Sequence, residues 1–269
     1  MSNGYDYAAG TTPLLISIPH DGRLLAPAMA ESMTECGSDL PDTDWHVRRL
    51  YAFSKNLGAS IIAADYSRYV VDLNRSPTDE ALYAGRFGTG LIPRQTFHGQ
   101  QIYLPGNNPG EDEIRDRIDN YWRPYHDRIA SSLNDIRERF GYALLWDAHS
   151  IRSRVPSLFD GKLPALNFGV NDGRSCASDI IESVITEARA GGGYSVVLDG
   201  RFKGGYITRQ YGDPKENVHA IQLELAQRCY MNEDSRSFDD DLASQTQQVL
   251  SRVLQACLSS AASHYGKRG

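Results

Sequence analysis

The sequence has little that would place the protein in a membrane or on a nucleic acid. It contains no apolar run of about 18 residues, and it does not begin with the basic and apolar stretches of a secretion signal. Lysine and arginine number 28 against 34 aspartates and glutamates, which gives a net charge of -6 and no basic patch for anionic partners. We therefore expect a cytoplasmic protein that binds neither nucleic acid nor membrane.

Cysteine is scarce, and the motifs that hold nucleotides are missing. The four cysteines lie far apart and form no C-x-x-C pair, which argues against a thiolate zinc site and suits a reducing compartment. The glycine-rich stretch 202–212 matches neither G-x-G-x-x-G nor G-x-x-x-x-G-K-[ST]. Histidines and carboxylates remain as the available metal ligands, and the chain has only seven histidines.

Two apolar runs of the sequence are each followed by a histidine. Residues 142–146 form a continuous apolar run typical of a strand buried on both faces, and Asp147 and His149 come where that strand should end. Residues 13–18 form a similar run that His20 follows. Parallel strands would bring both rings to the carboxyl edge of one sheet, where ligands bind. We interpret the two histidines as metal ligands, although polar turns would give the same pattern.

Carboxylates lie near the same predicted edge. Asp42 and Asp44 precede a helix that should end at Gly58, and because one side chain suffices as a cap, the other is a candidate metal ligand. Glu224 lies in the predicted strand 219–225. A carboxylate on a central strand is costly without a partner or a function, so Glu224 is our candidate general base. An exposed edge strand is the alternative.

Two predicted loops carry arginines that could contact an anion. Arg152 lies in the loop 150–175, just past His149, and could contact an anionic substrate or a surface acid. Arg209 lies in the glycine-rich loop 202–212, where the backbone could approach a small substrate closely. A guanidinium group fits a carboxylate bidentately. The expected partner is a small-molecule substrate with carboxylates.

Buried strands alternate with helical patterns along the chain. Apolar residues recur at steps of three and four over 114–140, a helix in which His126 falls among the polar positions and is expected at the surface. A C-terminal helix is predicted over 237–264, and residues 76–110 form a long loop of the lid or binding type. No internal repeat or second domain boundary is visible, so the sequence predicts one α/β domain over residues 1–269.

Several separated motifs, in one order, resemble the N-formylglutamate amidohydrolase family. The resemblance extends from about residue 13 to residue 227. The motifs are Ser17-Ile18-Pro19-His20, Asp42-Thr43-Asp44-Trp45, Ser67-Arg68-Tyr69 through Asp72-Leu73-Asn74-Arg75, Trp146-Asp147-Ala148-His149-Ser150, Phe168-Gly169 with Asp172-Gly173, Gly204-Gly205-Tyr206-Ile207-Thr208-Arg209 and Gln222-Leu223-Glu224.

The resemblance implies a fold similar to that of zinc carboxypeptidases. This is a three-layer α/β/α sandwich, phosphorylase/hydrolase-like, with a mixed, mostly parallel sheet. It also implies metal-dependent hydrolysis of the N-formyl amide of N-formyl-L-glutamate to formate and L-glutamate, in histidine degradation. Zn²⁺ is the implied cofactor, and other divalent ions also suit such ligands. A different N-acyl amino acid or a small peptide remains an alternative substrate, and a non-catalytic metabolite-binding relative is a further alternative.

The resemblance also implies roles for single residues. Asn74 and Arg75 look like a pair that grips a substrate carboxylate, with Arg209 as a further contact. His149 resembles a zinc ligand that follows a central strand. Glu224 resembles the base that takes a proton from water.

One metal ligand of the carboxypeptidase pattern is missing. That pattern is His-x-x-Glu, whereas the third residue after His20 is Arg23. The carboxylate ligand must therefore come from elsewhere in the chain, and we choose Asp44 over Asp42. The predicted metal site is His20, Asp44 and His149.

Overall fold

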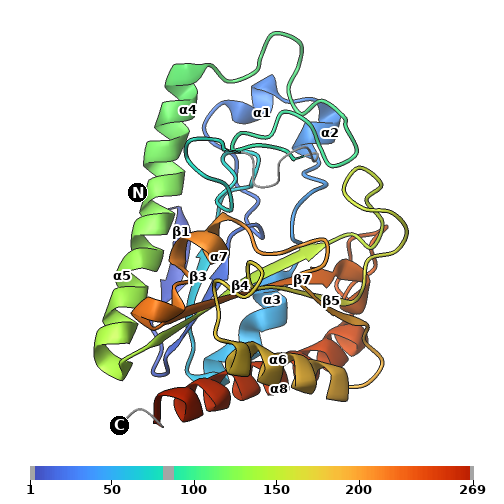
Figure 1. Ribbon diagram of the computed structural model, residues 1–269. Coiled ribbons are helices and arrows are strands. Elements are labelled where there is room, and N and C mark those ends of the chain that lie inside the picture. The colour runs from blue at the N-terminus through green and yellow to red at the C-terminus, as the bar shows by residue number, and fades with distance from the viewer. Residues whose placement is uncertain (1–3, 81–87, 267–269) are drawn as a thin grey trace.

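A seven-stranded mixed sheet forms the centre of the molecule (Figure 1). The computed structural model describes residues 4–80 and 88–266. The strands lie in the order β1-β3-β2-β4-β7-β5-β6; the β1–β3 and β5–β7 pairs are antiparallel, and the other four pairs are parallel. The strands are β1 Tyr5–Ala8, β2 Leu14–Ile18, β3 Ser60–Ala64, β4 Ala143–Ile151, β5 Leu166–Gly169, β6 Val196–Leu198 and β7 Val218–Ala226.

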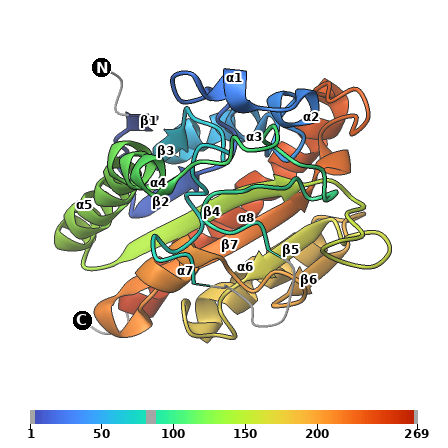
Figure 2. The ribbon, with the colours of Figure 1, turned by 90° about the horizontal axis from the view of Figure 1, so that it is seen from above.

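Helices cover both faces of this sheet (Figures 1 and 2). Helix α5 (Arg123–Phe140), preceded by α4 (Glu111–Arg117), lies on one face, and α6 (Ser178–Ala190) and α8 (Asp240–Gly266) lie together on the other. The predicted three-layer α/β/α sandwich with a mixed, mostly parallel sheet is therefore confirmed. The shorter helices are α1 Met29–Ser32, α2 Glu35–Ser38, α3 Val47–Leu50, α7 Tyr206–Tyr211, the 3₁₀ helices Tyr51–Leu57, Pro214–Glu216 and Gln227–Cys229, and the π turn Ile118–Trp122.

Among the described residues, no helix has the length and apolar character needed to cross a membrane.

Side chains of the central strand β4 alternate between two hydrophobic cores. Leu144 and Trp146 pack in the core that contains α6 and α8, whereas Leu145 packs in the core that contains α5. Further along the strand, the α5 face becomes polar, because Asp147 and His149 take the alternate positions that follow Leu145. All of these residues are buried. The α5 face of the sheet thus changes from hydrophobic to polar within a single strand, and we call its polar part, around Asp147 and His149, the polar floor.

The strands on either side of β4 make the same change at the same level. In β2, Leu15 belongs to the α5 core and Ser17 takes the next position on that face. In β7, Ala220 belongs to that core, and Glu224 lies two alternate positions further along. The parallel register pairs His149 with Glu224. Polar residues from three strands therefore meet on one face, near the carboxyl ends.

Most strands and helices predicted from the sequence are present, but their limits differ. The prediction that the central strand ends at Trp146 was wrong, because β4 continues to Ile151 and pairs with β7 along its whole length. Asp147 and His149 therefore lie within the strand. The helix near residue 47 begins without an aspartate cap, since His46 is its N-cap in a left-handed conformation, but the expected stop at Gly58 is confirmed.

The predicted loops contain regular elements that the sequence did not reveal. Strand β5 lies within the predicted loop 150–175, and α7 lies within the glycine-rich loop 202–212. In the predicted loop 76–110, the described residues 76–80 and 88–110 form no helix or strand, and 81–87 lie outside the described residues. The expectation that His126 lies at the surface was wrong, because this residue is 4% exposed.

Packing between β4 and α5 should contribute strongly to stability. Leu145 is 1% exposed within that core, so we expect Leu145→Ala to lower the free energy of unfolding by about 2–5 kcal/mol. Leu104 is 40% exposed, and Leu104→Ala should change it by less than about 0.5 kcal/mol. Urea unfolding of both variants measures the difference. Equal losses would contradict the central place of Leu145 in this core.

Candidate active site

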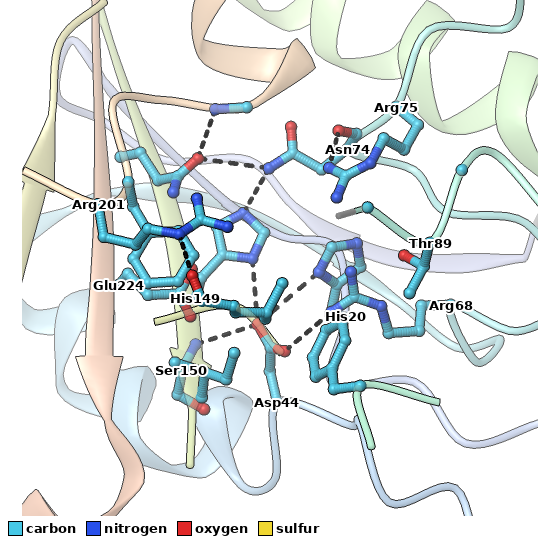
Figure 3. Close-up of a pocket in the computed structure, with 18 of the residues that line it drawn as sticks. His20, Asp44, Arg68, Asn74, Arg75, Thr89, His149, Ser150, Arg201 and Glu224 are labelled. Carbon is cyan, nitrogen blue, oxygen red and sulfur yellow. Dashed lines mark hydrogen bonds and ion pairs between the residues drawn. The ribbon is translucent and has the colours of Figure 1, made fainter. Parts of the chain in front are cut away.

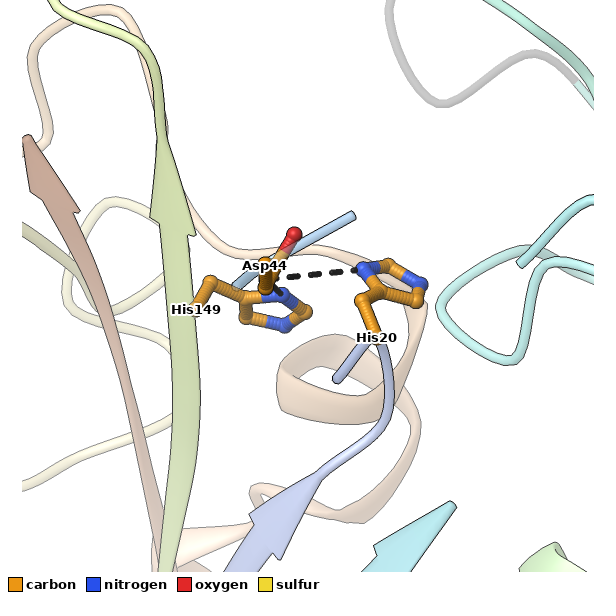
Figure 4. Close-up of side chains that lie close together, drawn as sticks. All are labelled: His20, Asp44 and His149. Carbon is orange, nitrogen blue, oxygen red and sulfur yellow. Dashed lines mark hydrogen bonds and ion pairs between the residues drawn. The ribbon is translucent and has the colours of Figure 1, made fainter. Parts of the chain in front are cut away.

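Three side chains from separate parts of the chain converge on the polar face of the sheet (Figure 4). His20 follows β2, Asp44 lies in the loop before α3, and His149 lies in β4. Asp44 Oδ2 is 3.0 Å from His149 Nδ1 and 3.8 Å from His20 Nδ1. One potential ligand atom of each residue lies within 4.8 Å of the other two, and all three residues are buried. The predicted ligand group is therefore brought together.

The nitrogen and oxygen atoms of these three side chains form a suitable set of ligands for a metal ion. His20 Nδ1 is buried and has no hydrogen-bond partner within the described part of the chain, although it faces Asp44. Buried polar atoms are rarely left unsatisfied, and an ion between the ring and the carboxylate would satisfy this one. Two imidazole nitrogens and one carboxylate oxygen form the ligand set of many catalytic zinc sites, which keep a further position open.

The far nitrogens of both imidazole rings meet buried aspartates. His20 Nε2 lies 2.8 Å from Asp72 Oδ1, and His149 Nε2 lies 3.0 Å from Asp147 Oδ2. A carboxylate that accepts the Nε2–H proton fixes the tautomer and leaves the Nδ1 lone pair for a metal. These two contacts make Asp147 and Asp72 suited to orient the two imidazole rings toward a metal ion.

Burial and close charges set the protonation of the three candidate ligands. Burial alone would raise the pKa of Asp44, but the hydrogen bond and charge of His149 and the charge of Arg68 hold this pKa below its usual value. Burial and the charge of Arg68 lower the pKa of His20. Burial also opposes a charge on His149, yet Asp147 and Asp44 hold the pKa of this ring well above its usual value. An ionised Asp44 thus lies between a neutral His20 ring and a protonated His149 ring, so the binding of a metal ion would release the proton of His149 Nδ1.

A cavity of about 230 Å³ opens over the three residues (Figure 3). Glu224 lines this cavity and is 8% exposed. Burial raises the pKa of its carboxyl group to about 8, and the charge of His149 opposes this rise. A carboxyl group whose pKa lies near neutrality can both accept and release a proton at physiological pH. Glu224 is therefore suited to acid–base chemistry in this cavity.

In the described part of the chain, three guanidinium groups line the cavity (Figure 3). Arg68 is buried and donates to Asp72 Oδ2 at 2.6 Å, and its Nε atom has no hydrogen-bond partner among the described residues. Arg75 follows Asn74 in the loop after β3. Arg201 lies after β6 and packs on the ring of Phe202, 5.2 Å from its centroid. Such groups suit a substrate with carboxylates.

Comparison with known proteins identifies the family. Residues 12–231 match the family model described as N-formylglutamate amidohydrolase. The chain belongs to this family. Relatives named N-formylglutamate deformylase, from Pseudomonas putida and Pseudomonas aeruginosa, are each 48% identical to it; the alignments cover 98% and 96% of this chain and 99% and 97% of the relatives. A crystal structure of N-formylglutamate amidohydrolase from Ralstonia eutropha JMP134 has the same fold, with a TM-score of 0.81 at 23% identity over 98% of this chain and 100% of that one.

Asn74 lines the cavity of this amidohydrolase family member, but protein groups occupy its amide. Asn74 Nδ2 is 2.8 Å from His149 Nε2 and 3.1 Å from Asp147 Oδ2, and Oδ1 accepts the Ile207 amide proton at 2.8 Å. A Cβ atom at Gly205 would lie 2.3 Å from Nδ2, so the amide has little room to turn. Since the Nε2–H group of His149 is directed at Asp147, the Asn74 amide donates to Asp147 Oδ2 and only lies beside the ring. Asn74 is therefore a positioning group for the Asp147–His149 pair, and its contacts give no support to the predicted grip on a substrate carboxylate.

Three other residues considered from the sequence lie apart from the cavity lining. Arg152 donates to Asp234 at 3.1 Å, so the structure favours the surface acid over the predicted substrate contact. Arg209 donates its Nε proton to the backbone of its own loop and also does not line the cavity. Asp42 accepts hydrogen bonds from two nearby residues and stays outside the ligand group that contains Asp44.

The sequence did not predict that Arg68 and Arg201 line this cavity. Arg68 lies within one of the family motifs, so its position was visible in the sequence, but no spacing rule connects it to the cavity. Arg201 follows the edge strand β6, and nothing in the sequence indicates that the chain after this strand reaches the cavity.

Metal binding can show whether Asp44 or Asp42 is the carboxylate ligand. We expect Asp44→Asn to weaken the binding of a divalent ion by more than the roughly 10–100-fold that loss of an orienting group costs, because a ligand is removed. Asp42→Asn should retain the ion, since the amide oxygen can still accept from Tyr69 and Phe97. Metal content after dialysis against Zn²⁺, measured by mass spectrometry, tests this. Equal metal content in the two variants would rule out Asp44 as a ligand.

Proposed function

We propose that this protein hydrolyses the N-formyl amide of N-formyl-L-glutamate to formate and L-glutamate, with Zn²⁺ held by His20, Asp44 and His149. The observation that carries the proposal is the convergence of these three groups beside Glu224 in a cavity lined by arginines. Two relatives that are 48% identical over nearly their whole length are named for this deformylation, which supports the same activity here.

The base in this reaction would be Glu224. A bound divalent ion would supply Lewis acidity, lowering the pKa of a water molecule and polarising the formyl oxygen. Glu224 takes a proton from the attacking water as the new carbon–oxygen bond forms at the formyl carbon. When the carbon–nitrogen bond breaks, Glu224 delivers this proton to the amine of glutamate, and formate leaves. The β4–β7 register pairs Glu224 with His149, and this closeness supports Glu224 as the base.

Arg68 is suited to stabilise the negative oxygen that develops on the formyl group. Its guanidinium group is buried, held by Asp72 and stacked over Phe97 at 4.9 Å from the ring centroid. Since the group is already fixed and desolvated, little reorganisation is needed when charge develops in the transition state.

Arg75 and Arg201 are the proposed contacts for the two substrate carboxylates. They come from different loops and lie on different sides of the cavity in Figure 3. A cavity of about 230 Å³ between two guanidinium groups favours a small dianion over a peptide.

The four cysteines are unpaired, which supports the expected cytoplasmic location.

Release of formate tests the reaction and its base together. Protein supplied with Zn²⁺ should release formate from N-formyl-L-glutamate, and a chelator should abolish the release until Zn²⁺ is restored. Glu224→Gln should lower kcat by about 10²–10⁴-fold while retaining the metal, because the proton acceptor is lost. A variant as active as the wild type would exclude Glu224 as the base. No release despite bound metal would direct the search to other N-acyl amino acids.

The two arginines can be assigned with a pair of substrates. N-formyl-L-glutamine shares only the α-carboxylate with N-formyl-L-glutamate. The variant that loses the contact to the α-carboxylate should have a kcat/KM about 10-fold or more lower for both compounds. The variant that loses the contact to the side-chain carboxylate should show this loss only for N-formyl-L-glutamate. Each substitution, Arg75→Gln or Arg201→Gln, removes one charged hydrogen bond. Arg152→Gln, which changes a residue outside the cavity, is the matched control and should alter neither value. If Arg75→Gln or Arg201→Gln behaves like this control, that arginine is not a carboxylate contact.

A further inference from the structure

The end of the π turn Ile118–Trp122 and the first turn of α5 contact the backbone on both sides of Asn74. Trp122 Nε1 donates to the carbonyl oxygen of Arg75 at 3.0 Å, and His126 Nε2 lies 2.9 Å from the carbonyl oxygen of Leu73. The rings of Trp122 and His126 stack, with centroids 3.7 Å apart and planes 20° from parallel. One rigid pair of rings on a long helix therefore holds two of the three carbonyl groups in the segment 73–75.

The π turn Ile118–Trp122 lets the rings of Trp122 and His126 contact the segment 73–75 while α5 remains packed on the sheet. Trp122 and His126 are four residues apart and therefore neighbours on one side of the helix. Trp122 belongs to the same hydrophobic core as Tyr125 and Ile129, so this part of the chain both packs on the sheet and reaches the segment 73–75. A π turn adds a residue to the helical turn and changes the register between α4 and α5. Such turns often occur at functional sites.

The protonation state of the buried His126 ring suits its hydrogen bond to the carbonyl oxygen of Leu73. Burial lowers the pKa of its ring to about 3, so the ring is neutral and offers one donor and one acceptor. Nε2–H donates to Leu73, which leaves Nδ1 to accept from the Tyr211 hydroxyl group at 2.9 Å. Tyr211 ends α7, and Ile207 in the same helix donates to the side chain of Asn74. Helices α5 and α7 thus hold the same segment from two directions.

The held segment leads directly into the cavity. The guanidinium group of Arg75 donates to the carbonyl oxygen of Asn74 at 3.0 Å and lines the cavity. The amide proton of Tyr206 in α7 is directed at the same carbonyl oxygen, at 3.3 Å. All three carbonyl oxygens of 73–75 are therefore engaged, and the position of the Arg75 side chain depends on that fixed backbone.

We propose that Trp122 and His126 are positioning residues that hold Arg75 where it binds a substrate carboxylate. The inference rests on the proposed function, in which Arg75 makes that contact. A guanidinium group on a fixed backbone loses less conformational freedom when it pairs with the substrate, so the pair strengthens substrate binding without touching the substrate. The effect falls mainly on KM, because the Asn74 side chain, which reaches the metal-ligand group, is held separately by its contacts with Ile207 and Asp147.

The test compares variants of the two rings. Trp122→Phe retains an aromatic ring for the stack and removes only the N–H donor, and His126→Leu removes the donor to Leu73. Each should raise KM for N-formyl-L-glutamate about 5-fold or more, the value of one hydrogen bond, while kcat changes less than about threefold and metal content is unchanged. His126→Gln, which can replace the Nε2–H donor, should recover much of the loss. Tyr121→Phe, in the same π turn but against Tyr66, is the control and should retain the wild-type KM.

Arg75→Gln distinguishes failure of this inference from failure of the proposed function. If Arg75→Gln leaves KM unchanged, the proposed carboxylate contact is wrong, and the positioning role is overturned with it. If Arg75→Gln raises KM but Trp122→Phe and His126→Leu do not, only the positioning role is overturned. A lower melting temperature with unchanged KM in the ring variants would likewise leave them a purely structural role.

Discussion

The site depends on keeping two polar side chains buried on the central strand. Asp147 and His149 follow Leu145 on the α5 face of β4, where an uncompensated charge would be very costly. Their compensation comes from several directions. Ser17 in β2 donates to Asp147 Oδ1 at 3.2 Å, and Asn74, from the loop after β3, reaches Asp147 Oδ2. The polar floor therefore forms only when β2, β4 and this loop are all in place.

That requirement explains why so much of the surrounding chain is irregular. Regular strands and helices satisfy their own backbone groups, whereas loop residues can turn side chains and amide protons toward buried carboxylates. Asp44, in the loop before α3, accepts the backbone amide proton of Ser150 in β4, and the amide of Gly205, in the loop before α7, donates to the side chain of Gln222 in β7. The sheet supplies rigid positions for His149 and Glu224. The loops supply the hydrogen bonds and charges that offset the free-energy cost of burying these polar side chains.

The sequence predicted the parts of the site that follow local rules. His20 and His149 were found because each comes after an apolar run, and Glu224 because a carboxylate interrupts a buried strand. Arg152 was misplaced because nearness to His149 in the chain says nothing about the direction of the chain after β4 ends. His126 was misplaced because the segment that buries it, residues 73–75, lies about 50 positions away in the sequence. Contacts between distant loops leave no periodic signal, and such contacts also bring Arg201 to the cavity.

The charges of the site indicate how metal and substrate would depend on each other. Asp44, Asp72 and Asp147 surround the two imidazole rings, and Arg68 pairs with two of these carboxylates. Once His149 has released its proton to act as a ligand, the group carries an excess of about two negative charges, which one divalent ion would neutralise. Without the ion, a dianionic substrate would approach a negative floor despite Arg75 and Arg201. With the ion, the negative charge of this group would be neutralised, so metal binding would strengthen the attraction of Arg75 and Arg201 for a dianionic substrate.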